Sequence, residues 1–269
     1  MVSTTTSAPE YRYENFRLSH VLADMRFDPN TPAAGDRLPH LDLQTLDGDR
    51  ITFEDLDRPH LFVFGSNTCP MTASAGDVVE DLHRDFGERI RFVLVQVREA
   101  HPGEHIPQPS SFEQKEAHAR RLRDALDVTF TVAIDDLDGS FHSSLDPKPN
   151  AAYLVDTQGT ILFRSMWSSD EKGLRSALAA TIEGRTPAKR QSTRTMKPLL
   201  RSIGHVDRVI RDAGPSASRD LLRSAPPMLL GARLAGLFSG VSPNRRGYAL
   251  MATTGAILLA ALAAFALLL

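Results

Sequence analysis

The C-terminal segment of this chain most constrains its fold, because it contains no charged side chain. Residues 248–269, YALMATTGAILLAALAAFALLL, are 22 consecutive uncharged residues. As an α-helix rising about 1.5 Å per residue, the segment would be roughly 33 Å long, enough to cross a hydrocarbon layer of about 30 Å. We therefore predict one transmembrane helix at 247–269.

The residues around this segment predict how the helix is used. Arg245 and Arg246 precede it, and no residue follows it in the sequence. The positive-inside rule then predicts a tail anchor that leaves the large N-terminal part in the cytoplasm. A stripe of small residues at four-residue spacing would let two such helices approach closely, so a homodimer is one arrangement that the sequence allows. The stripe consists of Ala252, Ala256, Ala260 and Ala264.

The charge divides the rest of the chain into two unlike parts. Residues 185–246 carry 13 Lys and Arg against three Asp and Glu, whereas residues 1–184 carry 18 against 30. We expect a basic linker followed by an amphipathic helix, with the apolar residues 199, 203, 206 and 210 on one face. Beside a membrane anchor this helix would lie on an anionic lipid surface, with 228–238 as a second interfacial segment; the alternative is packing on the globular domain. The pattern suits lipid better than nucleic acid, so no nucleic-acid partner is expected.

Residues 36–184 have the pattern of an α/β domain. Alternating runs on both sides of Gly48 predict a hairpin, in which the glycine supplies the positive φ of the turn. The apolar runs 60–66 and 90–97 are typical of strands buried on both faces, and the helical period between them predicts a βαβ unit. The remaining expected elements are a helix at 112–126, strands at 130–135 and 151–164, and a helix from about 169. Together they predict an α/β sandwich.

The chain is therefore expected to have four parts. An irregular or partly helical extension occupies 1–35 and precedes the α/β domain at 36–184. The basic linker with its amphipathic helix occupies 185–246, and the transmembrane anchor occupies 247–269. This division follows the changes in composition and charge along the sequence.

Cys69 is the single cysteine of the chain, so no internal disulfide can form. It lies where the strand at 60–66 gives way to a helix expected at 70–86. Proline favours the first position of a helix, which makes Cys69 the expected N-cap. The helix dipole and the free N–H groups there would lower the pKa of the thiol and make it a nucleophile. The alternative is a small apolar residue that only fills a core.

Two linked motifs surround this cysteine. The stretch FGSNTCP (64–70) is followed by REAHPGE (98–104) at the end of the next expected strand. Gly65, Ser66, Thr68, Cys69 and Pro70 in the first stretch, and Glu99, Ala100 and His101 in the second, resemble the motifs of the iodothyronine deiodinase group. That group belongs with the redoxins and peroxiredoxins to the thioredoxin-like class. The resemblance covers about residues 38–183 and implies a thioredoxin-like sandwich with a central mixed sheet.

The resemblance also implies roles for individual residues. It places the reacting chalcogen at Cys69, an assisting polar group at His101, and a proline opposite the thiol at Pro149. In that class this proline bond is commonly cis, which the Lys148–Pro149 bond could adopt. Two departures argue against thyroid-hormone deiodination: cysteine replaces selenocysteine, and Asn67 replaces an auxiliary cysteine. A specialised hydrogen-peroxide site is weakened as well, because Phe62 occupies the proline position of the peroxiredoxin pattern.

We expect the Cys69 thiolate to attack a peroxide oxygen, a disulfide sulfur or a carbon-bound halogen. His101 would protonate the leaving group, because the ordinary pKa of histidine lies near neutrality. The resulting sulfenic acid or mixed disulfide would be reduced by an external thiol, either thioredoxin or a low-molecular-weight thiol. We expect no cofactor and no metal, and either a small molecule or a thiol/disulfide as substrate.

The residues beside the thiol have two alternatives each. The hydroxyls of Ser66 and Thr68 would hydrogen-bond the thiolate or serve the first turn of the helix. Glu99 would orient His101 or cap the end of its strand. Pro70 and Pro149 are expected, with Glu99, to line the substrate site.

The sequence thus favours a membrane-anchored thiol oxidoreductase that faces the cytoplasm. The alternative is a catalytically inactive thioredoxin-like binding or scaffold module tethered to the membrane. The pKa of Cys69 distinguishes them, because a value near 8.5 or above would favour the scaffold.

Overall fold

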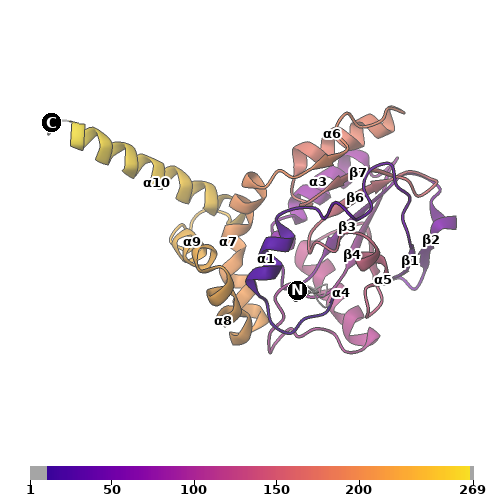
Figure 1. Ribbon diagram of the computed structural model, residues 1–269, viewed down its shortest axis with the longest axis horizontal. Coiled ribbons are helices and arrows are strands. Elements are labelled where there is room, and N and C mark those ends of the chain that lie inside the picture. Colours follow the sequence, from indigo (N-terminus) through magenta and orange to yellow (C-terminus); the bar gives the residue numbers. More distant parts are fainter. Residues whose placement is uncertain (1–10, 267–269) are drawn as a thin grey trace, which may run out of the picture.

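The computed structural model describes residues 11–266, which form a mixed sheet with helices on both faces and a helical C-terminal region (Figure 1). The strands are β1 (Asp42–Thr45), β2 (Arg50–Thr52), β3 (His60–Gly65), β4 (Arg91–Gln96), β5 (Thr131–Ile134), β6 (Ala152–Val155), β7 (Ile161–Ser165) and β8 (Gln191–Ser192). The helices are α1 (Leu18–Asp24), α2 (Pro70–Ala73), α3 (Gly76–Phe86), α4 (Phe112–Leu126), α5 (Ser140–Ser144), α6 (Glu171–Ile182), α7 (Met196–Ala213), α8 (Pro215–Ser224), α9 (Pro226–Gly236) and α10 (Pro243–Ala266), with a 3₁₀ turn at Phe53–Asp55.

The sheet has the order β2-β1-β5-β4-β3-β6-β7-β8. Strands β3, β4 and β5 run parallel, whereas β6 pairs antiparallel with β3, and β7 with β6. The apolar runs chosen from the sequence therefore form the parallel centre of the sheet, and the βαβ unit is confirmed. So is the hairpin of β1 and β2, where Gly48 has a φ of 92°. The fold is the α/β sandwich with a central mixed sheet that the sequence predicts.

Each face of the sheet has its own apolar core. On one face, α3, α4 and α6 contribute valines, leucines and alanines that pack against the alternate residues of β3 and β4. On the other face, α5 and the segment before β1 pack against Phe62, Phe64 and Tyr153. This alternation follows from the two-residue period of a strand, since successive side chains point to opposite faces.

The helix expected at 70–86 is divided in two, which is a correction to the prediction. It stops after Ala73 and begins again at Gly76, and the Ser74 hydroxyl donates to the Met71 carbonyl oxygen at 2.9 Å. A side chain at Gly76 would come within 3.1 Å of the Leu126 carbonyl oxygen, so the glycine lets α3 approach the end of α4. The consequence for Cys69 is that only one helical turn follows it directly.

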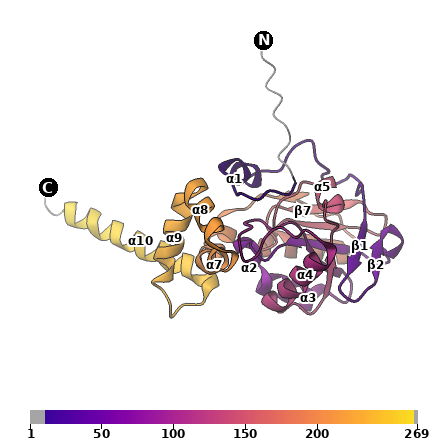
Figure 2. The ribbon, with the colours of Figure 1, turned by 90° about the horizontal axis from the view of Figure 1, so that it is seen from below.

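The region 185–246 is a folded part of the molecule. The expected linker contributes β8, which pairs parallel with β7. Helix α7 is amphipathic as predicted, but its residues Val206 and Ile210 are buried in a third apolar core with α8, α9 and the aromatic residues Tyr13 and Phe16. Of the two alternatives for this helix, the structure shows packing on protein. Figure 2 shows α7, α8 and α9 grouped at one end of the sandwich.

Helix α10 leads away from this group (Figures 1 and 2). Its first turns pack on α7 at two glycines, because a side chain at Gly204 would overlap the Pro243 carbonyl and one at Gly247 the Leu200 carbonyl. From Met251 onward its large apolar side chains are exposed. The segment Pro243–Ala263 has a mean hydropathy of 1.4 and is long and apolar enough to cross a membrane, which agrees with the predicted helix. Residues 267–269 and the Ala264 side chain of the small-residue stripe lie outside the described parts.

Candidate active site around Cys69

Cys69 occupies the predicted position, at the N-cap of α2 with Pro70 as the first helical residue. It lies four residues after Gly65, the last residue of β3, and the segment 97–101 follows the carboxyl end of the parallel neighbour β4. The two sequence motifs are therefore brought to the same edge of the sheet. In open α/β sheets this edge is where ligands bind.

Glu99 connects the two motifs. Its buried carboxylate accepts hydrogen bonds from the Thr68 backbone N–H at 2.9 Å and from the Thr68 hydroxyl at 2.7 Å. The same carboxylate lies 2.9 Å from His118 Nδ1 and accepts a bond from the Gln96 amide at 3.1 Å. These contacts do not support the alternative in which Glu99 orients His101. Its carboxylate fixes the loop that carries Cys69.

The Ser66 and Thr68 hydroxyls have neither of the two expected roles: among residues 11–266 their hydrogen bonds go to the segment 99–101 rather than to the thiol or to the first turn of α2. Thr68 Oγ1 accepts a hydrogen bond from the His101 backbone N–H at 3.0 Å, and Ser66 Oγ accepts one from the Ala100 N–H at 3.3 Å. The hydroxyl that lowers the pKa of the Cys69 thiol belongs to Thr72, a residue that the sequence analysis did not single out. The sequence signal that could have identified Thr72 was its position three residues after the N-cap, in the first turn of α2.

Cys69 differs from the prediction in its ionisation. Its side chain is 2% exposed, and burial raises the pKa of the thiol to about 11. The hydroxyl and N–H of Thr72 and the N–H of Met71 act in the opposite direction and favour the thiolate, with a smaller effect. The predicted lowering of the pKa is thus wrong for this conformation. One short helical turn does not compensate for the loss of water around the sulfur.

Two of the residues that exclude water from Cys69 come from outside the sandwich. Cys69 belongs to neither sheet core but to a small cluster with Phe27, Met71, Ala100, Met166 and Trp167, against which Leu199 packs. Phe27 belongs to the N-terminal extension and Leu199 to α7. We call these two residues the cover. The Arg164 guanidinium, from β7, lies 4.1 Å from the centre of the Phe27 ring and so holds the Phe27 half of the cover in place.

His101 is the second residue whose expected role changes. Its side chain is 6% exposed, its ring centre lies 4.1 Å from that of Phe16, and burial lowers its pKa to about 3. The imidazole is therefore neutral at pH 7 and cannot protonate a leaving group as an imidazolium. Within residues 11–266 its Nδ1 has no hydrogen-bond partner. The expectation of a pKa near neutrality is wrong because the N-terminal extension covers the ring.

Asp24 is a candidate acid that the sequence analysis missed. Burial raises its pKa to about 6, and its charge contributes to the raised pKa of Cys69. It lies at the end of α1, on the same N-terminal extension as Phe27. Nothing in the local sequence marks it, because its environment is created by Arg98, Lys148 and Asp146 from distant parts of the chain.

The prolines of the site are both buried. Pro70 begins α2 as expected, whereas the bond between Lys148 and Pro149 is trans, as are all peptide bonds in the described part of the chain. The following residue, Asn150, donates to the Phe64 carbonyl at 3.2 Å and to Thr72 Oγ1 at 3.3 Å. These bonds place the turn before β6 beside the start of α2.

Comparisons with known proteins give similarity in fold only. No protein-family model and no curated protein matches the chain. An uncharacterized conserved protein from Geobacillus kaustophilus is 19% identical, with a TM-score of 0.49 over 61% of this chain and 89% of that one. An uncharacterized thioredoxin-like protein from Porphyromonas gingivalis is 17% identical, with a TM-score of 0.41 over 57% of this chain and 95% of that one. A secreted disulfide oxidoreductase from Mycobacterium tuberculosis is 16% identical, with a TM-score of 0.35 over 45% of this chain and 80% of that one.

The strand order decides the fold class. A parallel β5-β4-β3 unit is extended by the antiparallel hairpin β6-β7, and helices cover both faces. The fold is thioredoxin-like. Because the similar structures are under 20% identical with TM-scores below 0.5, the chemistry has to be argued from this chain's own residues.

Proposed function

We propose that this protein is a membrane-anchored thiol oxidoreductase that reacts through Cys69, and that the conformation described above is its closed state. The observation that carries the proposal is the position of Cys69, at the N-cap of α2, beyond the carboxyl end of β3 and in the loop that Glu99 fixes. The Thr72 hydroxyl and the N–H groups of Thr72 and Met71 lower the pKa of its thiol, although burial has the larger and opposite effect. A cysteine that only filled a core would not need to lie at the start of a helix.

The cover supports a closed state better than a permanently buried thiol. Phe27 and Leu199 come from the N-terminal extension and from α7, so they can move without opening either core of the sandwich. Movement of the cover would return water to Cys69 and lower the pKa of the thiol. The donors of α2 and the loop fixed by Glu99 would stay in place, because their contacts lie within the sandwich.

The reaction of an exposed thiolate follows ordinary sulfur chemistry. Attack on a peroxide forms an S–O bond and breaks the O–O bond, leaving a sulfenic acid and an alkoxide or hydroxide that takes up a proton. At pH 7 Asp24, with a pKa of about 6, is mostly ionised and His101 is neutral, so the proton comes from the water that enters when the cover moves. Attack on a disulfide gives a mixed disulfide and releases a thiolate. An external thiol, such as thioredoxin or a low-molecular-weight thiol, then restores Cys69.

The substrate class is a peroxide or a disulfide, of the redoxin or peroxiredoxin-like kind. The motifs at 65–70 and 99–101 support the deiodinase-like subtype, and Glu99 and Thr68 join them into one unit. Removal of a carbon-bound halogen is the less favoured chemistry, because this chain has neither selenium nor a second cysteine. The exposed apolar part of α10 supports the anchor, and Arg245 and Arg246 favour a cytoplasmic domain.

Intact mass measurements on the full chain in detergent micelles test this function. The protein is exposed in turn to hydrogen peroxide, an organic hydroperoxide, oxidised glutathione and an iodinated phenol, with Phe27→Ala as the opened variant and Cys69→Ser as the control. We expect one compound to modify Phe27→Ala stoichiometrically at low dose, and Cys69→Ser not at all. Modification no faster than that of free cysteine by all four compounds would refute the function.

One observation favours a second candidate, a catalytically inactive scaffold module tethered to the membrane. In the closed conformation the pKa of the thiol, about 11, is well above 8.5. If the opened variant keeps this value and still reacts with none of the four compounds, the scaffold is the better description. The measurement above therefore distinguishes the two functions.

A further inference from the structure

Helix α9 is apolar on two opposite faces. Its inward face is buried and consists of Leu229, Ala232 and Ala235. Its outward face carries three leucines that are between 41% and 77% exposed. We call them the leucine stripe; it consists of Leu230, Leu234 and the C-cap residue Leu237. At 100° per residue the three members of the stripe lie within about 60° of one another, on the side of the helix opposite to the buried residues.

An apolar outward face is unusual for a helix at the surface of a protein. Such a helix normally carries polar side chains on the side that faces water, and a helix that is apolar all round is normally covered on both sides. The inward face of α9 is covered by the third apolar core, which contains residues of α7 and α8. Among residues 11–266 nothing covers the leucine stripe.

The position of α9 indicates what covers the stripe. Figures 1 and 2 both show α9 beside the first turns of α10, at the end of the molecule from which α10 leaves. The two helices pack on each other and on α7, so the structure fixes their relative position. The surface of a bilayer that α10 spans would therefore lie close to α9.

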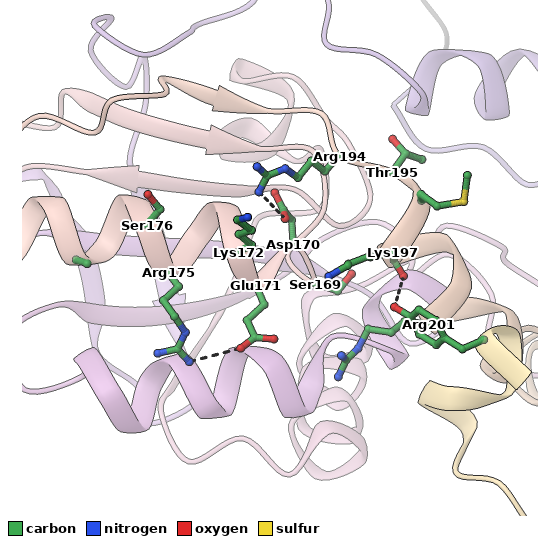
Figure 3. A pocket seen from close by; sticks show the side chains of 13 residues that line it. Ser169, Asp170, Glu171, Lys172, Arg175, Ser176, Arg194, Thr195, Lys197 and Arg201 are labelled. Atoms are coloured by element: carbon green, nitrogen blue, oxygen red, sulfur yellow. Dashed lines mark hydrogen bonds and ion pairs between the residues drawn. The ribbon is translucent and has the colours of Figure 1, made fainter.

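The start of α10 indicates the level of that surface. The Tyr248 hydroxyl donates to the Lys197 carbonyl oxygen at 3.3 Å, and Figure 3 shows Lys197 and Arg201 at the start of α7, where this contact is made. Tyrosine and basic side chains are typical of the level of lipid headgroups. The exposed apolar part of α10 begins shortly afterwards, at Met251. We therefore expect the surface of the bilayer near Tyr248.

The charge at this end of the molecule favours lipid over a second copy of the chain. Residues 221–266 contain four arginines and no acidic residue. Three of the arginines are exposed and take part in no ion pair among residues 11–266, namely Arg223, Arg233 and Arg245. Two copies that met through this end would bring like charges together, whereas an arginine can reach lipid headgroups while its methylene groups lie along apolar surface.

We propose that α9 is an interfacial helix whose leucine stripe inserts into the surface of the bilayer beside α10. The proposal rests on the membrane anchor of the proposed function. A single spanning helix would let the domain rotate about the axis of that helix. A second contact beside it, made by α9, fixes which side of the domain faces the lipid.

The test measures the depth of spin labels on the full chain in lipid nanodiscs. Because Cys69 is the single cysteine, a Cys69→Ala background allows one label at a chosen position. Leu237→Cys reports the stripe, Leu258→Cys reports the anchor, and Leu22→Cys is the control, because Leu22 of α1 is 63% exposed. Collisions of the label with oxygen, which concentrates in lipid, are compared with collisions with a water-soluble nickel complex.

We expect the ratio of oxygen to nickel collisions at position 237 to be about fivefold higher than at position 22, and to approach the ratio at position 258. A high ratio at 258 with equal ratios at 237 and 22 would overturn the proposal and leave the anchor intact. A low ratio at 258 would refute the anchor and the proposal together. Spin–spin broadening at 237 would assign the stripe to a second copy of the chain and would also overturn the proposal.

Variants of the stripe test whether its side chains hold α9 in the lipid. Leu230→Gln with Leu234→Gln should lower the collision ratio of the label at 237 about threefold, because glutamine favours water over the acyl region. The matched pair is Leu18→Gln with Leu22→Gln on α1, where both leucines are exposed, and it should leave the ratio at 237 unchanged. Equal effects of the two pairs would overturn the proposal.

Discussion

Removing the Leu199 side chain should make Cys69 more reactive. Leu199 is the part of the cover that α7 supplies, and it is only partly buried, so Leu199→Ala opens a path to the sulfur without emptying the core. Burial raises the pKa of the thiol from 9.0 to about 11. Since one pKa unit is a factor of ten in ionisation, the thiolate fraction at pH 7.5 can rise by at most about 100-fold. We expect Leu199→Ala to recover a part of this, about 5- to 20-fold, for a stability cost of about 1 kcal/mol.

The assay is alkylation of the full chain by iodoacetamide between pH 6.5 and 10.5, followed by intact mass. Phe27→Ala should act in the same direction as Leu199→Ala. Leu222→Ala is the matched control, because that leucine lies on α8 and is 52% exposed. Two results would refute the reasoning: a wild-type profile with a pKa at or below 8.5, or equal rates for Leu199→Ala and Leu222→Ala. Either would mean that the cover does not control the thiol.

Three further predictions concern the surroundings of the site and the anchor. Glu99→Gln should lower the free energy of unfolding by about 3 kcal/mol, because the two Thr68 donors lose a buried carboxylate acceptor. Urea unfolding measures this change. Glu116→Gln is the control, and it should leave the free energy of unfolding nearly unchanged because Glu116 is more exposed. Burial lowers the pKa of His101 to about 3. Between pH 6.5 and pH 3 the unfolded chain therefore binds a proton that the folded chain does not, so the free energy of unfolding falls as the pH is lowered. When the pH is lowered from 6.5 to 5, the free energy of unfolding of His101→Phe should therefore fall by about 2 kcal/mol less than that of wild type in the same urea assay. Equal decreases in the two proteins would exclude a buried neutral imidazole. Gly247→Ala should lower the melting temperature in micelles by several degrees, because its methyl group overlaps the Leu200 carbonyl, whereas Gly255→Ala, with no atom near its added methyl group, should leave it unchanged.

The sandwich was predictable because local patterns determine its elements. The apolar runs at 60–66 and 90–97 match β3 and β4, and the helix expected at 112–126 matches α4 residue for residue. The break between α2 and α3 was not predictable, since it depends on the close approach of Gly76 to the end of α4. Helix α5 and the two-residue strand β8 were too short to give a periodic signal.

The candidate site was predictable in position but not in environment. The strand-to-helix junction and proline at the first helical position place Cys69 correctly at the N-cap. The raised pKa of the thiol and the lowered pKa of His101 depend in part on segments more than 40 residues away in sequence, namely Phe27 and Phe16 of the N-terminal extension and Leu199 of α7. Contacts over such separations have no signature in local periodicity, so burial by a cover had to be observed.

The glycine contact between α7 and α10 has a mechanical consequence. Gly204 and Gly247 bring the backbones of the two helices together, so α10 continues from the folded part as a stiff rod rather than a loose tether. If α10 spans a bilayer, as proposed, the domain stands at a set height and tilt above the lipid. Only molecules that travel at that height would meet the cysteine.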